Sequence, residues 1–209
     1  MSTDGCRIWI ISFLQAVQEE NYAVIKWRGK LDAYAIGDDL DIVCEDIGRF
    51  VKKMMLVGND FVSAGFEISL WVAQDNKQVH LDLKEQNKLL FRFDIYKGLP
   101  NYTLVSINPD FLKKSLTDSL VEVIDQTTVK LASIDCDMVF RYLEYLEYGA
   151  ISPRKLQHYH WVSQKIAQLK SQFLALIQNY TDLPTIVSKE IMIDNLPTRE
   201  SFLCFKQKE

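Results

Sequence analysis

A short acidic segment near residue 40 constrains the fold more than any other part of the chain. It reads Gly-Asp-Asp-Leu-Asp-Ile-Val-Cys over residues 37–44, and its apolar part, residues 40–44, predicts a β-strand. Because strand side chains alternate between two faces, Asp39 and Asp41 point to one side, while Leu40 and Ile42 point to the other. The segment therefore predicts a strand with one face on a hydrophobic core and two neighbouring carboxylates on the other face.

Two further predicted strands each hold one aspartate among apolar neighbours. The strand predicted over residues 79–84 contains Asp82, and the strand predicted over residues 89–96 contains Asp94. Aspartate is unfavourable inside strands, so a central aspartate indicates a functional role more strongly than one in a loop. His80 shares the face of Asp82 and is interpreted as a structural hydrogen-bonding residue.

Two carboxylates on one strand face repel each other unless a positive charge lies between them. A hard divalent cation such as Mg²⁺ or Mn²⁺ supplies that charge and also binds phosphate oxygens. Asp39 and Asp41 therefore predict a metal-binding pair for phosphoryl or nucleotidyl transfer. The alternative is that the acids only keep an exposed strand soluble in an interaction protein. In that case we expect the four aspartates to be scattered in the folded chain instead of converging.

The whole chain predicts an α+β fold, with a small mixed sheet and flanking helices followed by a mostly helical C-terminal half. Besides the strands above, the pattern indicates a helix over 4–20, a strand over 22–27, a helix over 46–57, a strand over 66–73, a turn over 74–78, and helices over 111–123, 137–148 and 153–178. We divide the chain into an α/β core, residues 1–107, and a helical region, residues 108–209.

Composition limits the class of protein. The net charge of −4 argues against general nucleic-acid binding. The four cysteines form no Cys-x-x-Cys pair, so we interpret them as buried or idle thiols and expect a cytoplasmic protein. The apolar run over residues 8–14 is too short for a membrane span and lacks the flanks of a signal peptide, so it is interpreted as part of a core helix.

Taken together, residues 22–96 resemble the nucleotidyltransferase superfamily, which includes DNA polymerase beta and the CCA-adding enzymes. The resemblance lies in the order of a strand, a glycine turn, a strand with two alternating aspartates, a helix and a strand with a third aspartate. It implies that Asp39 and Asp41 hold Mg²⁺ and a nucleoside triphosphate. It also implies a third acid that completes the metal site or activates the attacking hydroxyl; Asp82 is our first choice and Asp94 the alternative.

A looser resemblance connects the chain to nucleotidyltransferase-like proteins of bacterial surface-polysaccharide gene clusters. It rests on the stretches WRG, DDLDIV, HLDL, FRFDIYKGLP and RYLEYLEY. This resemblance implies a sugar or a polysaccharide precursor as the hydroxyl acceptor.

The expected donor-binding segment is Arg28, Gly29 and Lys30, and it departs from the superfamily pattern. The superfamily has Gly-Ser or Gly-Gly where this chain has Gly29-Lys30. Lys30 could itself reach a phosphate, or it could mark a site for another phosphorylated donor, or for none. Two hypotheses follow: an Mg²⁺-dependent nucleotidyltransferase-like enzyme, or a catalytically inactive module of the same fold that binds a nucleotide or another phosphorylated ligand.

Overall fold

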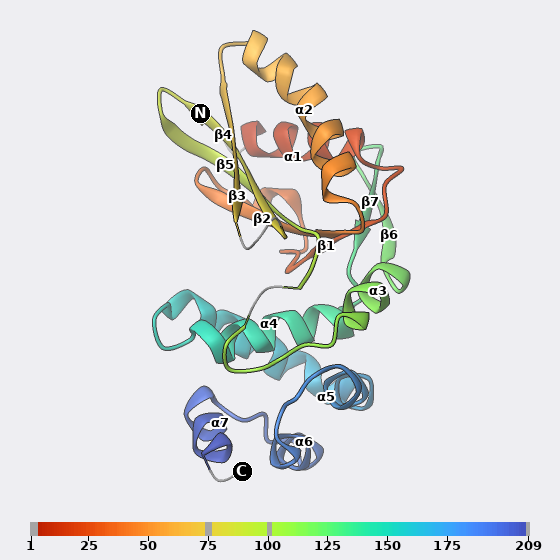
Figure 1. Ribbon diagram of the computed structural model, residues 1–209, viewed down its shortest axis with the longest axis vertical. Coiled ribbons are helices and arrows are strands. Elements are labelled where there is room, and N and C mark those ends of the chain that lie inside the picture. The colour runs from red at the N-terminus through yellow and green to blue at the C-terminus, as the bar shows by residue number, and fades with distance from the viewer. Residues whose placement is uncertain (1–3, 74–76, 100–101, 208–209) are drawn as a thin grey trace. The chain divides into compact units, whose positions relative to one another are not determined.

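The computed structural model describes residues 4–73, 77–99 and 102–207, and the chain forms two compact units (Figure 1). The sheet unit comprises Met1–Leu99 and Lys114–Ala132, and the helical unit comprises Pro100–Lys113 and Ser133–Glu209. The predicted α+β class, with a mixed sheet and a mostly helical C-terminal half, is confirmed. Within the predicted turn over 74–78, residues 74–76 lie outside the described part of the chain.

The acidic strand, β2 (Asp38–Cys44), is the central strand of a seven-stranded mixed sheet. The strand order is β3-β4-β5-β2-β1-β7-β6. The pairs β2–β5 and β1–β7 are parallel and the other neighbours are antiparallel. The remaining strands are β1 (Tyr22–Ile25), β3 (Glu67–Ala73), β4 (Gln78–Glu85), β5 (Lys88–Tyr96), β6 (Leu120–Ile124) and β7 (Thr127–Leu131). The three strands that carry the predicted aspartates are therefore consecutive in the sheet, in the order β4, β5, β2.

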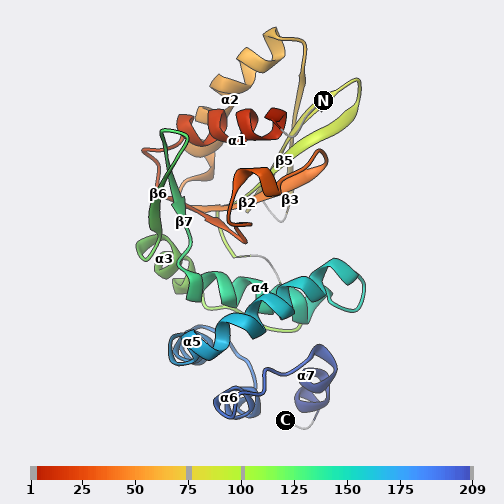
Figure 2. The ribbon, with the colours of Figure 1, turned by 180° about the vertical axis from the view of Figure 1, so that it is seen from behind.

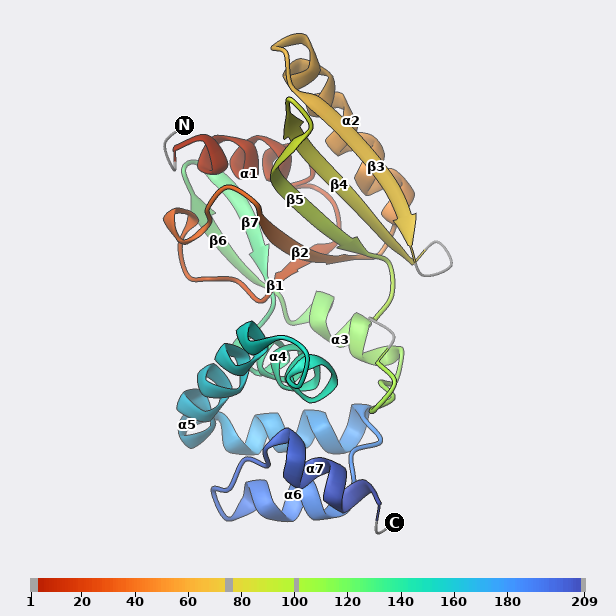
Figure 3. The same cartoon turned by 90° about the vertical axis from the view of Figure 1, so that its left-hand side faces the viewer.

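Helices α1 (Asp4–Ala16) and α2 (Ile47–Ser63) cover one face of the sheet (Figures 1 and 3). Phe13 of α1 packs on Phe93 of β5, with ring centroids 4.9 Å apart. Phe50 of α2 packs against Tyr22 of β1 at 5.4 Å. All four rings are fully buried. The alternation along β2 is thus confirmed, because Leu40, Ile42 and Cys44 belong to this core, while Asp39 and Asp41 alternate with them onto the opposite face.

A β-hairpin occupies residues 120–131, so the helix predicted over 111–123 is wrong beyond its first two turns. Helix α3 (Asp110–Thr117) ends before β6, and β6 pairs with β7 (Figure 2). The turn residues Asp125 and Gln126 adopt φ values of 49° and 65°, the left-handed conformation that two-residue hairpin turns favour. The apolar residues of β6 fit helical and strand spacing equally well, and pairing with β7 decides between the two.

The helical unit is built around α4 (Ile134–Tyr148), of which residues 136–146 are buried. The other helices are α5 (Leu156–Tyr180), which follows a short 3-10 turn and is kinked at Leu169, α6 (Thr185–Met192) and α7 (Arg199–Lys206). Tyr142 of α4 is fully buried and donates a hydrogen bond to the Pro197 carbonyl at 3.0 Å. In the described part of the chain, no helix has both the length and the apolar character needed to cross a membrane.

The aromatic core of the sheet unit gives a stability prediction. Replacing Phe93 by Ala removes a ring packed against Phe13 and Phe91, and we expect the free energy of unfolding to fall by about 3–5 kcal/mol. Urea denaturation followed by circular dichroism measures this loss. The control is Val121→Ala on β6, which is 63% exposed and should change stability by less than about 0.5 kcal/mol. Equal stabilities of the two variants would contradict this core.

Candidate functional site

The face of the sheet opposite α1 and α2 is turned toward the viewer in Figure 3. Two rows of paired, mostly polar residues cross its strands. One row runs, from strand to strand, through Asp41, Asp94, His80 and Trp71. The second row runs through Asp39, Arg92, Asp82 and Ser69. We call Asp39, Asp41 and Asp94 the acidic cluster, because Asp94 is the direct cross-strand neighbour of Asp41, and Asp39 is two residues away on the same face. By register, the four predicted aspartates therefore share one face of the sheet.

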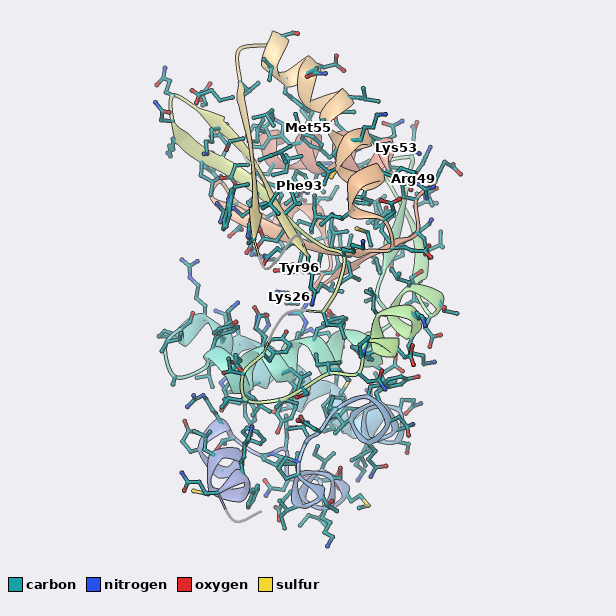
Figure 4. The ribbon with its side chains drawn as sticks, in the orientation of Figure 1. Lys26, Arg49, Lys53, Met55, Phe93 and Tyr96 are labelled. Carbon is teal, nitrogen blue, oxygen red and sulfur yellow. The ribbon has the colours of Figure 1, made fainter. Side chains whose placement is uncertain are left out.

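Asp41 is buried and held by a lysine from the end of β1. Its Oδ1 atom lies 2.7 Å from Lys26 Nζ, and it accepts a hydrogen bond from the Tyr96 hydroxyl at 3.3 Å. Figure 4 labels Lys26 and Tyr96, which lie close together at the end of the sheet. Lys26 adopts a φ of 56°, which is uncommon outside glycine. The chain itself thus supplies the positive charge that Asp41 needs.

Asp94 is buried beside Asp41 and contacts the ring of His80. Burial, followed by the nearby charge of Asp39, raises the pKa of Asp94 to about 7. Burial, followed by the nearby Arg92 guanidinium, lowers the pKa of His80. Asp94 therefore holds a proton far more readily than an ordinary aspartate, which is a property of general acids and bases.

Asp82 lies one strand further from β2 than Asp94 does, and it forms a two-pronged ion pair with Arg92. Arg92 Nε donates to Asp82 Oδ1 at 2.6 Å, and Arg92 Nη2 donates to Asp82 Oδ2 at 3.0 Å. Burial raises the pKa of Asp82, but the Arg92 partner outweighs burial and the net pKa is lowered. The register thus brings Asp94, the alternative third acid, next to Asp41, and places Asp82 beside Arg92.

The predicted donor-binding segment lies just after β1. Gly29 has a φ of +86° and an added Cβ would meet no atom within 4 Å, so the backbone conformation is what requires glycine there. Arg28 contacts Asp38 at 2.5 Å, while its distance to Asp39 is 3.7 Å. Lys30 is exposed. Arg28 is therefore already paired with Asp38 of β2, whereas Lys30 is accessible to a ligand from solvent.

The carboxylates of the acidic cluster are chemically suitable ligands for a divalent cation, but in this structure they contact Lys26 and Arg92. Carboxylate oxygens are the ligands that Mg²⁺ and Mn²⁺ prefer, and burial together with the nearby charge of Asp39 raises the pKa of Asp94. Within the residues that the structure describes, no group of three or more His, Cys, Asp or Glu side chains is arranged to hold a metal ion. A metal at Asp41 would therefore have to replace Lys26.

Sequence reasoning missed three residues of this face: Lys26, Tyr96 and Trp71. Lys26 reaches Asp41 through its left-handed backbone, for which the local sequence carries no turn signal. Tyr96 and Trp71 both lie in predicted strands, and strand alternation places Tyr96 on the face of Asp94. In the sequence, strand alternation is the one pattern that indicates which face of its strand Tyr96 or Trp71 occupies.

The chain was compared with protein families, curated proteins and solved structures. No protein-family model matches the chain, and no curated protein matches it. An antigenic nucleotidyltransferase-like protein from Paracoccidioides brasiliensis is similar in structure, with 13% identity, a TM-score of 0.46, and coverage of 97% of this chain and 99% of that chain.

Two bacterial structures are also similar. The “putative nucleotidyltransferase” from H. pylori has 8% identity, a TM-score of 0.42, and coverage of 100% of this chain and 99% of that chain. JHP933 from Helicobacter pylori has 9% identity, a TM-score of 0.41, and coverage of 99% and 92%. All three TM-scores lie below 0.5, and none of the three sequences is more than 13% identical to this chain.

The ion pair of Asp82 gives a pH-dependent prediction. Asp82→Asn removes the two-pronged partner of Arg92 and leaves Asp94, at 3.9 Å, as its nearest ion-pair partner, so we expect a loss of about 1.5–3 kcal/mol in the free energy of unfolding at pH 7. Because the folded-state pKa of Asp82 is lowered, its contribution is present above the unfolded pKa of about 3.9 and is lost as pH falls through the folded pKa. Denaturation at pH 7 and at pH 3.5, without divalent ions, measures the stability difference between Asp82→Asn and the unaltered protein. We expect this difference to be smaller at pH 3.5 than at pH 7.

Asp39→Asn is the matched control, because the Asp39 side chain is 51% exposed. It should leave stability at pH 7 nearly unchanged. If Asp82→Asn is as stable as the unaltered protein at pH 7, the ion pair has no structural role, and Asp82 regains its place as the first candidate for the third acid.

Proposed function

We propose that the protein is a divalent-metal-dependent, nucleotidyltransferase-like enzyme that transfers a nucleotidyl or substituted phosphoryl group to a hydroxyl acceptor. The observation that carries the proposal is the register of β2 and β5, which sets Asp94 beside Asp41, with Asp39 on the same face. Carboxylate oxygens are the ligands that a divalent cation prefers, and the ion would displace Lys26 from Asp41 when it binds.

Asp39 and Asp41 would hold Mg²⁺ or Mn²⁺. The ion, when bound, would neutralise phosphate charge and help to position the donor, which is a nucleoside triphosphate or another phosphorylated compound. The side chain of Asp39 is 51% exposed and can reach a ligand from solvent. Lys30, also exposed, would contact donor phosphates as a point charge.

Asp94 would take the proton of the acceptor hydroxyl, with Asp82 as the alternative. A pKa of about 7 suits a general base near neutral pH. As the acceptor oxygen bonds to phosphorus, its proton would move to an Asp94 carboxylate oxygen. The bond from that phosphorus to the bridging oxygen would break, and the rest of the donor would leave with that oxygen, as pyrophosphate when the donor is a nucleoside triphosphate. A sugar or a polysaccharide precursor is the acceptor class we propose, on the strength of the looser sequence resemblance.

A second candidate function is favoured by one contact, the 2.7 Å ion pair between Lys26 and Asp41. If Lys26 keeps this position in the working protein, it replaces the metal as the cation of the acidic cluster. The protein is then a catalytically inactive module that binds a nucleotide or another phosphorylated ligand without transferring it.

The metal site can be tested by thermal shift. We expect Mg²⁺ or Mn²⁺ together with a nucleoside triphosphate to raise the melting temperature, because a ligand that binds the folded state stabilises it. The Asp39→Asn/Asp41→Asn double variant should lose that shift. A metal-dependent shift that survives in the double variant would place the site elsewhere, and a metal-independent shift would support the inactive module.

Lys26→Met separates the two candidate functions. Removing Lys26 takes away the cation that competes for Asp41, so for the enzyme we expect the Mg²⁺ concentration at half-maximal shift to fall several-fold. For the inactive module, the unaltered protein shows no Mg²⁺-dependent shift and the variant acquires one. Lys88→Met, at an exposed position on β5, is the control for loss of a positive charge. An unchanged Mg²⁺ response of Lys26→Met would contradict metal binding at Asp41.

A further inference from the structure

The two edges of the sheet differ in how they are protected against pairing with another chain. Among the strands that the structure describes, β3 and β6 each have one neighbour, β4 and β7 respectively (Figure 3). Proteins protect such edges with charged side chains, prolines or bulges. The central residue of β6 is Glu122, whereas the single charged residue of β3 is Glu67, at the start of the strand. The middle of β3 therefore lacks the charge that protects β6.

Three consecutive apolar side chains of β3 are exposed. Leu70 is 41% exposed, Trp71 45% and Val72 56%. Leu70 and Val72 share the sheet face of Ile68, which packs against Gly58 of α2, and Trp71 lies on the opposite face. The exposed apolar surface therefore includes both faces of the strand edge, as expected of a strand that pairs with a further strand.

Trp71 shows the direction in which this edge is open. Its ring stacks on His80 of β4, with centroids 3.7 Å apart and an interplanar angle of 15°, so the side of the ring that faces the sheet is covered. The exposed part of the ring therefore points off the edge, away from β4 and the acidic cluster. Because the stack already fixes the ring, a partner strand would gain this contact at little cost in side-chain entropy.

We propose that β3 pairs antiparallel with β3 of a second copy of this chain, so that the two sheets join across a two-fold axis at Leu70. In this register all seven residues of β3 have a cross-strand neighbour: Leu70 faces Leu70, Ser69 faces Trp71, Ile68 faces Val72, and Glu67 faces Ala73. Because the axis is perpendicular to the sheet, the acidic clusters of both copies lie on the same face of the joined sheet.

The second copy is the partner that the sequence of β3 fits, because the strand is complementary to itself in this register. The large ring of Trp71 lies beside the small Ser69, and the two Glu67 carboxylates lie at opposite ends. The same arrangement at β6 would set Glu122 against Glu122, and like charges directly opposite each other are destabilising. Two-fold pairing also covers both β3 edges, so the assembly closes as a dimer.

Sedimentation velocity on the full chain, over about 1–100 µM, tests the dimer. We expect the unaltered protein to shift from monomer to dimer as its concentration rises. Leu70→Lys sets two ammonium groups opposite each other at the axis and should raise the dimer Kd by about 30-fold or more. Val123→Lys, at an exposed position on the other edge, is the matched control and should leave this Kd nearly unchanged. Circular dichroism melting checks that each variant folds.

Two further measurements test the register. Leu70→Glu alone should be as monomeric as Leu70→Lys, but an equimolar mixture of the two should dimerise, because residue 70 faces residue 70 across the axis. Leu70→Cys in a Cys204→Ser background, which removes the exposed native thiol, is a milder change for the fold. Directly opposed residues lie about 4.5–5.5 Å apart between Cα atoms, so mild oxidation should cross-link two copies through this cysteine and should not cross-link Val123→Cys.

Several outcomes would overturn the inference. An unaltered protein that stays monomeric at about 100 µM would leave the β3 edge to a strand of another protein. A dimer that forms equally well with Leu70→Lys would use another surface, and one that is lost with Val123→Lys alone would use β6. Failure of both the charge mixture and the cross-link would contradict the register at Leu70. None of these outcomes depends on the proposed function, because no measurement involves a metal or a nucleotide.

Discussion

The polar face of the sheet depends on positive charges that the chain itself places beside buried carboxylates. Asp41, Asp82 and Asp94 are each less than a tenth exposed, and an uncompensated buried carboxylate is strongly destabilising. Lys26 compensates Asp41, Arg92 compensates Asp82, and His80 contacts Asp94. Because each acid has its own partner from a neighbouring strand or strand end, the central strands can carry aspartates without losing their pairing.

These partners also divide the aspartates by role. Asp82 has a lowered pKa and a two-pronged arginine contact, which are features of a structural ion pair. Asp94 has a raised pKa and lies beside Asp41, so its protonation can respond to any cation that reaches the cluster. Asp39 is the exposed member. The three acids of the cluster therefore differ: Asp39 is exposed, Asp41 is bound to Lys26, and Asp94 readily holds a proton.

Much of the sheet was predictable because its strands have strong local patterns. Apolar alternation located β2, β4 and β5 and assigned Asp39 and Asp41 to one face, as the structure confirms. The β6–β7 hairpin was not predictable, because Leu120–Ile124 is short and largely exposed, so no buried face distinguishes a strand from a helix. Its identity comes from pairing with β7, which in turn pairs with β1.

The sequence by itself determined which residues form β2, β4 and β5 and which side of each of these strands is polar, because both follow from the alternation of neighbouring side chains. Only the tertiary structure decided which strands lie next to each other. The parallel pairing of β2 with β5 sets Asp94 beside Asp41 and leaves Asp82 to Arg92. Likewise, the backbone at Lys26 brings its ammonium group to Asp41. Such contacts join residues up to 55 positions apart, and they are set by how the whole sheet packs on α1 and α2, which no local pattern encodes.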